Sequence, residues 1–204
     1  MARLIYDRIF VFLIRDESWR EKLFVSFTPG SQDRVLNFGP YSSFSVVLFA
    51  RHYPAVTFWA LDTHRKAAKS QRRAERKRLG NVSFAKISGE NRLPFGAGSF
   101  DKVVCVLGLH DRPASAKLAI IKDFARVLRW GGTLHLIDFD KPQTRGEGGM
   151  LEFAGRIWGP EAVASHLDGS WIEILTKGGF AGVRRQPSYS IGIGRLSVIR
   201  ARKR

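Results

Sequence analysis

The 204-residue sequence contains one cysteine, Cys105, and no long uninterrupted apolar segment. A lone cysteine excludes an internal disulfide and a cysteine-rich zinc site, and we expect no metal centre. Nine charged residues interrupt the apolar residues of 1–27, which leaves neither the apolar core of a signal peptide nor the roughly 18 apolar residues of a membrane span. We therefore expect a cytoplasmic protein with no membrane-spanning segment.

Acidic residues are scarce. The sequence has 34 lysines and arginines against 18 aspartates and glutamates, which gives a formal net charge of +16. Residues 64–78 contain eight basic side chains and one acid, and residues 174–204 contain eight and none. This charge favours anionic partners such as anionic lipid, nucleic acid or phosphorylated metabolites, although a run like 64–78 is also typical of the solvated face of a helix.

Short apolar segments rich in β-branched and aromatic residues alternate with helical segments. This alternation is the pattern of a parallel sheet with crossover helices. The expected strands lie at residues 34–38, 57–61, 82–87, 102–107 and 133–139, and the expected helices at 44–51, 65–79 and 114–129. Each strand is apolar along its whole length, which indicates helices on both faces of the sheet.

The C-terminal part of the chain is expected to complete the sheet. A helix is expected from Pro160 to about residue 177, and the strands expected at 182–186 and 195–201 are close enough to pair as an antiparallel hairpin at one edge. Residues 143–149 are expected to form the loosest part of the chain. The sequence thus predicts an α/β fold with a mainly parallel, seven-stranded sheet and a C-terminal antiparallel hairpin.

The first strand-to-helix turn and the end of the second strand are the expected ligand-binding positions, because ligands of open α/β sheets bind outside the carboxyl ends of the strands. Asp62 ends the second strand 23 residues after Gly39, close to the spacing at which a carboxylate binds ribose hydroxyls. The turn 37–43 has one glycine where a nucleotide-binding turn usually has two or three. Pro40 lacks an N–H donor and Tyr41 adds bulk, which predicts a tighter cradle.

Four motifs occur in a fixed order: VLNFGPYSS at 35–43, LPFGAGSFDKVV at 93–104, ARVLRWGGTLHLIDFDKP at 125–142 and GGF at 178–180. With this set the chain resembles the class I S-adenosylmethionine-dependent methyltransferases. It is similar in particular to the ubiquinone and menaquinone biosynthesis C-methyltransferases and the bacterial phospholipid N-methyltransferases. The resemblance implies a Rossmann-like methyltransferase fold and S-adenosylmethionine as cofactor.

The resemblance also implies which residues bind the cofactor. They are Asn37, Gly39 and Tyr41 in the first turn, Asp62 and Thr63 after the second strand, Gly89 and Glu90 before the LPF motif, and Leu107 after the fourth strand. Asn37 stands where the family has an acid, and Tyr41 where it has a second glycine. These departures predict that S-adenosylmethionine binds weakly or not at all.

Methyl transfer from a sulfonium is an in-line displacement, so most of its acceleration comes from alignment of the reacting atoms. A base is needed only where the acceptor loses a proton. His110 is the titratable residue best placed for this catalytic role, and Asp111 is expected to orient or charge its ring. A His110 that only hydrogen-bonds backbone remains the alternative, and His135, inside a predicted strand, is expected to be structural.

Residues 1–30 are expected to form a helical lid over the cofactor pocket, because the related families have one there, and residues 31–204 to form the methyltransferase-like domain. In this interpretation Tyr6 lines the site. The alternative is an ordinary amphipathic helix that packs Ile5, Ile9, Phe12 and Leu13 on the sheet.

Two functional classes remain open. The first is a methyltransferase with a small-molecule or lipid-like acceptor, whose substrate is not simply that of the quinone enzymes because their longer segment after DFDKP is missing. The second is a binding or scaffold protein that has lost catalysis and binds an anionic surface or an acidic partner. A nucleic-acid-modifying enzyme is less favoured, since the basic runs lack interleaved aromatic residues. We expect peripheral association with an anionic membrane, such as the inner membrane face, ahead of nucleic acid binding. The sequence does not indicate an oligomeric state.

Overall fold

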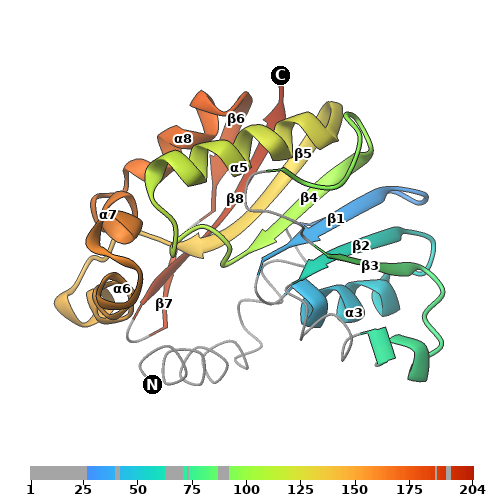
Figure 1. The fold of residues 1–204 in the computed structure, drawn as a ribbon, viewed down its shortest axis with the longest axis horizontal. Coiled ribbons are helices and arrows are strands. Elements are labelled where there is room, and N and C mark those ends of the chain that lie inside the picture. The colour runs from blue at the N-terminus through green and yellow to red at the C-terminus, as the bar shows by residue number, and fades with distance from the viewer. Residues whose placement is uncertain are drawn as a thin grey trace.

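A computed structural model describes residues 27–39, 42–62, 71–72, 74–86, 92–186, 188–191 and 194–204. Its centre is one sheet (Figure 1). The strands are β1 Arg34–Phe38, β2 Thr57–Asp62, β3 Val82–Lys86, β4 Phe100–Val106, β5 Leu128–Phe139, β6 Phe180–Arg185, β7 Tyr189–Ser190 and β8 Arg195–Lys203. Their order is β3-β2-β1-β4-β5-β8-β6, with β7 paired to β8. The first five strands are parallel, and β8 is antiparallel to β5, β6 and β7.

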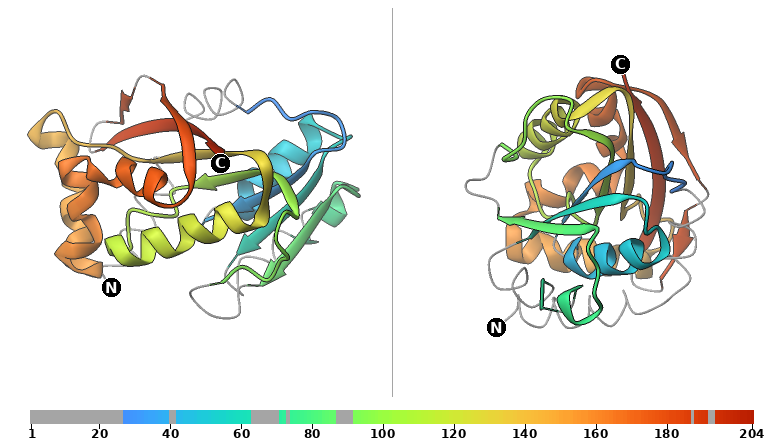
Figure 2. Two further views of the ribbon diagram at one scale, coloured as in Figure 1. Left: turned by 90° about the horizontal axis from the view of Figure 1, so that it is seen from above. Right: turned by 90° about the vertical axis from the view of Figure 1, so that its right-hand side faces the viewer.

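Helices cover both faces of this sheet. They are α3 Ser42–His52, α5 Ala114–Val127, α6 Arg145–Trp158, α7 Pro160–Asp168 and α8 Glu173–Lys177, with a 3₁₀ turn at Ser170–Ile172. Figure 2 shows α3 and α5 on opposite sides of the sheet. Two separate apolar clusters result, one beneath α3 and α6 and the other beneath α5 and α8. The predicted doubly covered parallel sheet is confirmed.

The packing explains why the central strands are apolar along their whole length. In β1, Val35 packs in the cluster beneath α3, and the next residue, Leu36, packs in the cluster beneath α5. Successive side chains of a strand point to opposite faces, so both sets of residues are buried when both faces are covered. The five expected parallel strands therefore all occur, with β4 beginning two residues and β5 five residues earlier than predicted.

Three expectations about the C-terminal half are wrong. Residues 143–149 do not form a loose segment, because α6 begins at Arg145. The side chain of Thr144 caps this helix by accepting a hydrogen bond from the Glu147 N–H. The single helix expected from Pro160 to about 177 is broken at Gly169, which has a φ of +86°. The two-residue strand β7 adds an eighth strand to the seven expected.

Several expected features lie outside the described residues. These are residues 1–26 of the lid expected at 1–30, including Tyr6, and residues 65–70 and 73 of the helix expected at 65–79. The described positions 71–72 and 74–76 within that range are helical. Phe27, where the description begins, is buried and its ring contacts those of Phe49 and Tyr53. None of the described helices is both long enough and apolar enough to cross a membrane.

Candidate active site

The carboxyl ends of β1, β2 and β4 meet at one edge of the sheet. Phe38 at the end of β1 lies beside Leu61 of β2 and Cys105 of β4, and all three strands run in the same direction. Asp62 follows Leu61 as the last residue of β2. The crossovers reverse direction between β1 and β4, so this edge is the position at which ligands of open α/β sheets bind. The predicted placement of Asp62 at the carboxyl end of β2 is confirmed.

Gly39 connects β1 to the turn before α3. Its φ of +123° is strained for any other residue, and a β-carbon at this position would lie 2.4 Å from the carbonyl oxygen of Val106. The first turn therefore lies directly against the end of β4. Only glycine permits this close approach of two backbones.

Asn37 lies beneath this turn and is fully buried. Its Nδ2 donates a hydrogen bond to Ser45 Oγ at 3.0 Å, and Ser42 Oγ donates to the carbonyl of Leu61 at 2.7 Å. These bonds tie the first turn of α3 to the ends of β1 and β2. The Asn37 Oδ1 atom has no hydrogen-bond partner among the described residues, which leaves an unsatisfied acceptor at the turn.

Four of the expected cofactor residues lie outside the part of the chain that the structure describes: Tyr41, Thr63, Gly89 and Glu90. The side chain of Asp62 is also outside that part. Their roles remain predictions from the family resemblance.

Leu107 turns the chain sharply after β4. It has a φ of +54°, and its N–H donates a hydrogen bond to the carbonyl of Ile137 at 2.7 Å. The next residue, Gly108, is packed so closely that a β-carbon would lie 2.9 Å from Cys105 Sγ. This compact turn directs Leu109 and His110 over the carboxyl end of β5.

His110 lies against Asp138, near the carboxyl end of β5. The distance between His110 Nδ1 and Asp138 Oδ1 is 3.2 Å, and the two side chains are 3% and 0% exposed. The other oxygen, Oδ2, accepts a hydrogen bond from the Leu109 N–H at 2.8 Å, and Oδ1 also accepts one from the Phe139 N–H. Burial acts to raise the pKa of Asp138, but the hydrogen bond and charge of His110 hold that pKa below its ordinary value. The site thus contains an ionised carboxylate that orients an imidazole.

Asp111 does not take the position beside His110 that the sequence suggested. Its Oδ1 atom lies 3.9 Å from Arg112 Nε, which itself donates a hydrogen bond to the carbonyl of Gly108. Asp138 holds that position instead. The sequence analysis missed Asp138 because it is 28 residues away from His110 along the chain. The DFD motif places Asp138 at the end of a predicted strand, and this position could have indicated it.

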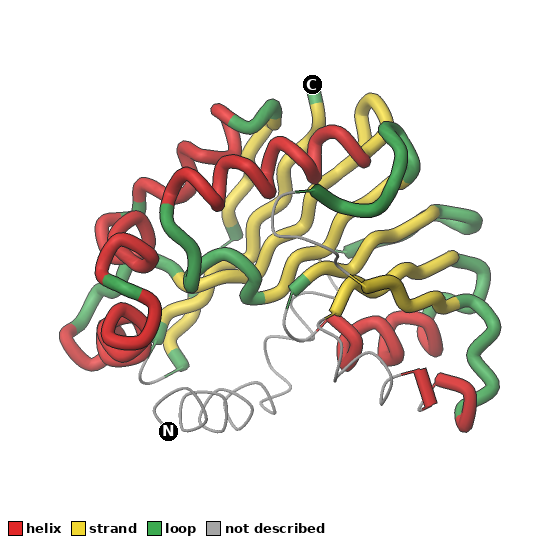
Figure 3. The backbone as a smooth tube through the Cα atoms, in the orientation of Figure 1, coloured by secondary structure: helices red, strands yellow, loops and turns green. Residues whose placement is uncertain are grey.

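Further buried polar groups surround the end of β5, beneath α7. Figure 3 shows α6 and α7 beside this end of the strand. Lys117 of α5 is 1% exposed and donates hydrogen bonds to the carbonyl of Ala162 and to Ser165 Oγ at 2.8 and 2.7 Å. Burial lowers the pKa of Lys117 to about 8. His166 donates from Nδ1 to the carbonyl of Phe139 at 2.7 Å, and burial lowers its pKa to about 3, so it is neutral.

Comparison with known proteins supports a single family. A family model described as a methyltransferase domain matches residues 35–132. Over 70 residues the chain is 39% identical to a ubiquinone/menaquinone biosynthesis C-methyltransferase of Rhizobium johnstonii. Over 110 residues it is 31% identical to the mitochondrial 2-methoxy-6-polyprenyl-1,4-benzoquinol methylase of Leishmania donovani. Residues 35–132, just under half of the chain, are thus similar to a methyltransferase domain, and the curated relatives are methyltransferases.

The sequence matches cover only part of each methyltransferase. They span 34% of this chain and 26% of the Rhizobium protein, and 48% of this chain and 36% of the Leishmania protein. The fold likeness is more extensive. The YcgJ protein of Bacillus subtilis superimposes with a TM-score of 0.71 at 17% identity, covering 91% of this chain and 99% of that one. A SAM-dependent methyltransferase of Aquifex aeolicus gives 0.64 at 19% identity, covering 90% and 89%.

The methyltransferase family implies S-adenosylmethionine as cofactor, and the described part of the site fits it. The Gly39 turn brings the ends of β1 and β4 together without an intervening side chain. The unsatisfied Asn37 Oδ1 is a buried acceptor at the position that the family resemblance assigns to the amino group of the cofactor. The site therefore keeps an acceptor there, but a neutral one.

Proposed function

We propose that this chain transfers a methyl group from S-adenosylmethionine to a small-molecule or lipid-like acceptor at the carboxyl ends of β1, β4 and β5. The proposal rests on one arrangement: the buried His110–Asp138 pair next to the Gly39 and Leu107 turns. A histidine held by a carboxylate is a recurrent general base, and this one lies at the ligand-binding edge of the sheet.

The proposed mechanism assigns separate tasks to the residues of the chain. When bound, S-adenosylmethionine supplies the electrophilic methyl group. Asn37, Gly39 and Asp62 would hold it at the ends of β1 and β2. The Asp138 carboxylate accepts a hydrogen bond from His110 Nδ1–H, which fixes the tautomer in which Nε2 is the basic nitrogen. Nε2 would then take the proton that the acceptor loses, and Asp138 would stabilise the resulting imidazolium.

The acceptor class is part of the proposal. One curated relative is named for ubiquinone and menaquinone biosynthesis and another as a polyprenyl-benzoquinol methylase, which supports an apolar or lipid-like acceptor for this chain. The ring of Phe139 contacts the ring of His110 edge-on, with 5.0 Å between centroids, so the base has an apolar neighbour. An acceptor with a flat apolar body would match this surrounding.

A catalytically inactive binding module is the second candidate. It is favoured by the first turn, in which Tyr41 and Ser43 stand where the family has glycines. The two candidates differ in their response to the cofactor. An enzyme binds S-adenosylmethionine and releases S-adenosylhomocysteine when an acceptor is present, whereas the module does neither.

Calorimetric titration with S-adenosylmethionine is the first test, followed by transfer of a labelled methyl group to a panel of quinols, lipids and small metabolites. We expect binding and transfer, with transfer lost in His110→Gln and retained in His52→Asn. His52 is an exposed histidine of α3 and serves as the matched control. Absence of heat and of S-adenosylhomocysteine with every acceptor would instead support the binding module.

A further inference from the structure

Three exposed arginines surround a hollow at the opposite end of the sheet from the proposed active site. The hollow has a volume of about 290 Å³ and is lined by Thr133, Gly182, Arg184, Arg200, Ala201 and Arg202. Thr133 lies five residues before Asp138 on β5, which corresponds to about 17 Å at roughly 3.3 Å per residue. The hollow is therefore separate from the His110–Asp138 pair.

The strand register concentrates positive charge at this hollow. Arg184 of β6 lies directly opposite Arg200 of β8, and Arg200 lies opposite His135 of β5 on its other side. Arg202, two residues along β8, is opposite Thr133. Like charges directly opposite each other on neighbouring strands are destabilising. Without a ligand of opposite charge, the repulsion between Arg184 and Arg200 therefore destabilises the sheet.

The arginines of the hollow differ from the other arginines of the same strands. Arg185 of β6 forms an ion pair with Asp140, and Arg195 of β8 forms a two-bond ion pair with Glu147. Within the described part of the chain, no carboxylate pairs with Arg184, Arg200 or Arg202. Arg202 donates only to the backbone carbonyl of Gly131, at 3.3 Å. Three guanidinium groups are thus available for one anion.

Thr133 lines the hollow beside these arginines, and the buried His135, two residues along β5, contacts it. His135 is 1% exposed, and its Nε2 atom lies 3.0 Å from Thr133 Oγ1. Its Nδ1 atom has no hydrogen-bond partner among the described residues. Burial, with the positive charges of Lys102 and Arg200, lowers the pKa of His135 to about 3, so His135 adds no charge. The hollow thus combines three guanidinium groups with the hydroxyl of Thr133, which suits a phosphate group.

An exposed tryptophan at the same end of the sheet indicates the source of the phosphate. Trp130 is 77% exposed, the only large apolar side chain of that exposure among the described residues, and it directly precedes Gly131, which Arg202 contacts. Tryptophan beside basic side chains is typical of surfaces at the headgroup level of a membrane. The lining of the hollow has no aromatic side chain on which a base could stack, which disfavours single-stranded nucleic acid.

We propose that this end of the sheet docks on an anionic membrane, with a lipid phosphate in the hollow formed by Arg184, Arg200 and Arg202 and with Trp130 in the headgroup layer. The carboxyl ends of β1 and β4 are at the other end of the sheet. Docking would therefore hold the protein at a membrane without covering the reaction site. Membrane docking and methyl transfer are separate proposals, and an experiment can refute either one without refuting the other.

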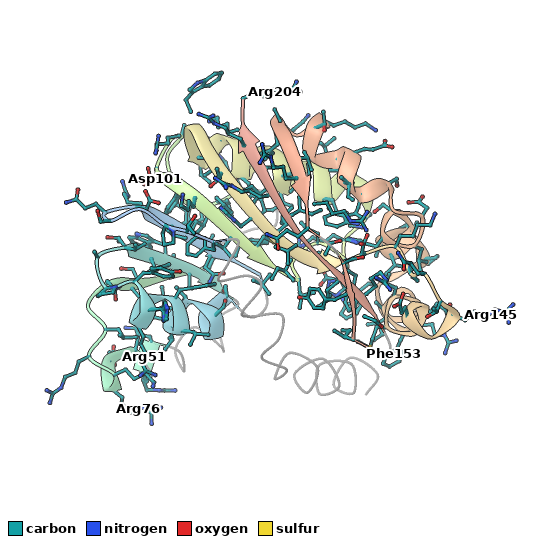
Figure 4. All side chains as sticks on the ribbon, turned by 180° about the vertical axis from the view of Figure 1, so that it is seen from behind. Arg51, Arg76, Asp101, Arg145, Phe153 and Arg204 are labelled. Carbon is teal, nitrogen blue, oxygen red and sulfur yellow. The ribbon has the colours of Figure 1, made fainter. Side chains whose placement is uncertain are left out.

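A second basic hollow supplies the matched control. It has a volume of about 500 Å³ and includes Arg51, Lys77 and Arg78. Arg51 is in the last turn of α3, where the partial negative charge of the helix end disfavours anions. Figure 4 shows Arg51 and Arg76 together at one end of the molecule and Arg204 at another. Arg76 directly precedes Lys77 of this hollow, so replacing Arg51 and Arg76 removes the same charge as replacing Arg184 and Arg200, but away from the docking surface.

The experiment is co-sedimentation with vesicles of equimolar phosphatidylglycerol and phosphatidylcholine, and with phosphatidylcholine alone, at about 0.15 M salt. We expect the protein to bind only the anionic vesicles. Arg184→Gln/Arg200→Gln should weaken binding about 30-fold, equivalent to about 1 kcal/mol per arginine, and Arg51→Gln/Arg76→Gln by less than about threefold. Trp130→Ala should also weaken binding. Both arginines of the pair are exposed, and an unfolding temperature no lower than that of the unmodified protein confirms that the variants are folded.

Three results would overturn the proposal. The first is an equal loss in both double variants, which would mean that net charge alone drives binding. The second is displacement of the protein from vesicles by millimolar inorganic phosphate with matching calorimetric binding, which would identify a site for free phosphate. The third is tighter retention on a generic RNA than on the anionic vesicles, with the same dependence on Arg184 and Arg200. Titration of the same variants with S-adenosylmethionine tests the proposed methyltransferase activity separately, so a failure of membrane docking and a failure of that activity can be distinguished.

Discussion

Asp138 holds the imidazole of His110 across the carboxyl ends of two neighbouring parallel strands, with 3.2 Å between Oδ1 and Nδ1. The same carboxylate accepts hydrogen bonds from two backbone N–H groups, those of Leu109 and Phe139. Because these bonds stabilise its charged form, Asp138 is anionic although it is fully buried. The proposed base is therefore positioned before any acceptor arrives.

The first prediction is that Asp138→Asn and His110→Gln act as one unit. Each variant should lower the rate of methyl transfer about 100-fold or more, since Asn no longer selects the tautomer with a basic Nε2. The double variant should be no slower than His110→Gln alone, because the pair performs a single task. Single-turnover rates measure this effect, and the dissociation constant of S-adenosylmethionine should stay within about threefold. Additive losses in the double variant would contradict a shared role.

The second prediction concerns two expected cofactor residues: Tyr41, which departs from the family in the first turn, and Asp62, which matches the family at the end of β2. Tyr41→Gly should strengthen binding of S-adenosylmethionine, because a glycine lets the backbone approach the cofactor. Asp62→Ala should abolish binding, because it removes the carboxylate that the family uses for the ribose. Calorimetry on the two variants measures both effects. Tight binding by the unmodified protein that Asp62→Ala leaves unchanged would indicate a different site or a different ligand.

Most of the sheet could be predicted from the sequence because a strand buried on both faces has a direct signature in its composition. β1 was predicted at residues 34–38 and occurs at Arg34–Phe38. Helix α6 was not predicted, because Gly146, Gly148 and Gly149 lower its intrinsic helix propensity. Tertiary contacts compensate for this: Met150 and Leu151 are buried.

The partner of His110 could not be predicted by proximity in the sequence. Asp111 is adjacent along the chain, but the turn at Leu107 and Gly108 directs His110 toward β5. Which carboxylate lies there depends on the pairing of β4 with β5, in which Val106 is opposite Ile137. Once this register is known, Asp138 is the next residue. The contact is therefore a property of the topology rather than of a local motif.

The third prediction is a pH dependence of stability that comes from Glu147. Its hydrogen bonds with Arg195, at 2.9 Å, and with the Gln143 N–H lower the pKa of Glu147 to about 2 from 4.5. A carboxylate whose pKa is lower in the folded state stabilises the fold above its unfolded pKa, and this contribution is lost as pH falls toward the folded pKa. Glu147→Gln should therefore lower the unfolding temperature at pH 7, and the difference from the unmodified protein should shrink between about pH 4.5 and pH 2. Thermal unfolding at pH 7, 5, 4 and 3 measures this trend, and a constant difference over that range would contradict it.

The last prediction uses two adjacent arginines of β6 that have opposite electrostatic surroundings. Arg184 lies directly opposite Arg200, whereas Arg185 forms an ion pair with the fully buried Asp140 and donates a hydrogen bond to Ser197 Oγ at 3.0 Å. Arg184→Gln should raise the unfolding temperature by about 1–2 °C at low salt, since a like-charge pair costs about 0.5 kcal/mol, and the gain should vanish at 1 M salt. Arg185→Gln should lower the unfolding temperature at both salt concentrations, because it leaves a buried carboxylate without its cation. Thermal unfolding of the two variants in parallel tests both signs. If Arg185→Gln stabilises the protein, the ion pair with Asp140 does not support the fold. If Arg184→Gln destabilises the protein, Arg184 has a compensating partner within the protein. That second result would also remove the reason to expect an external anion in the hollow.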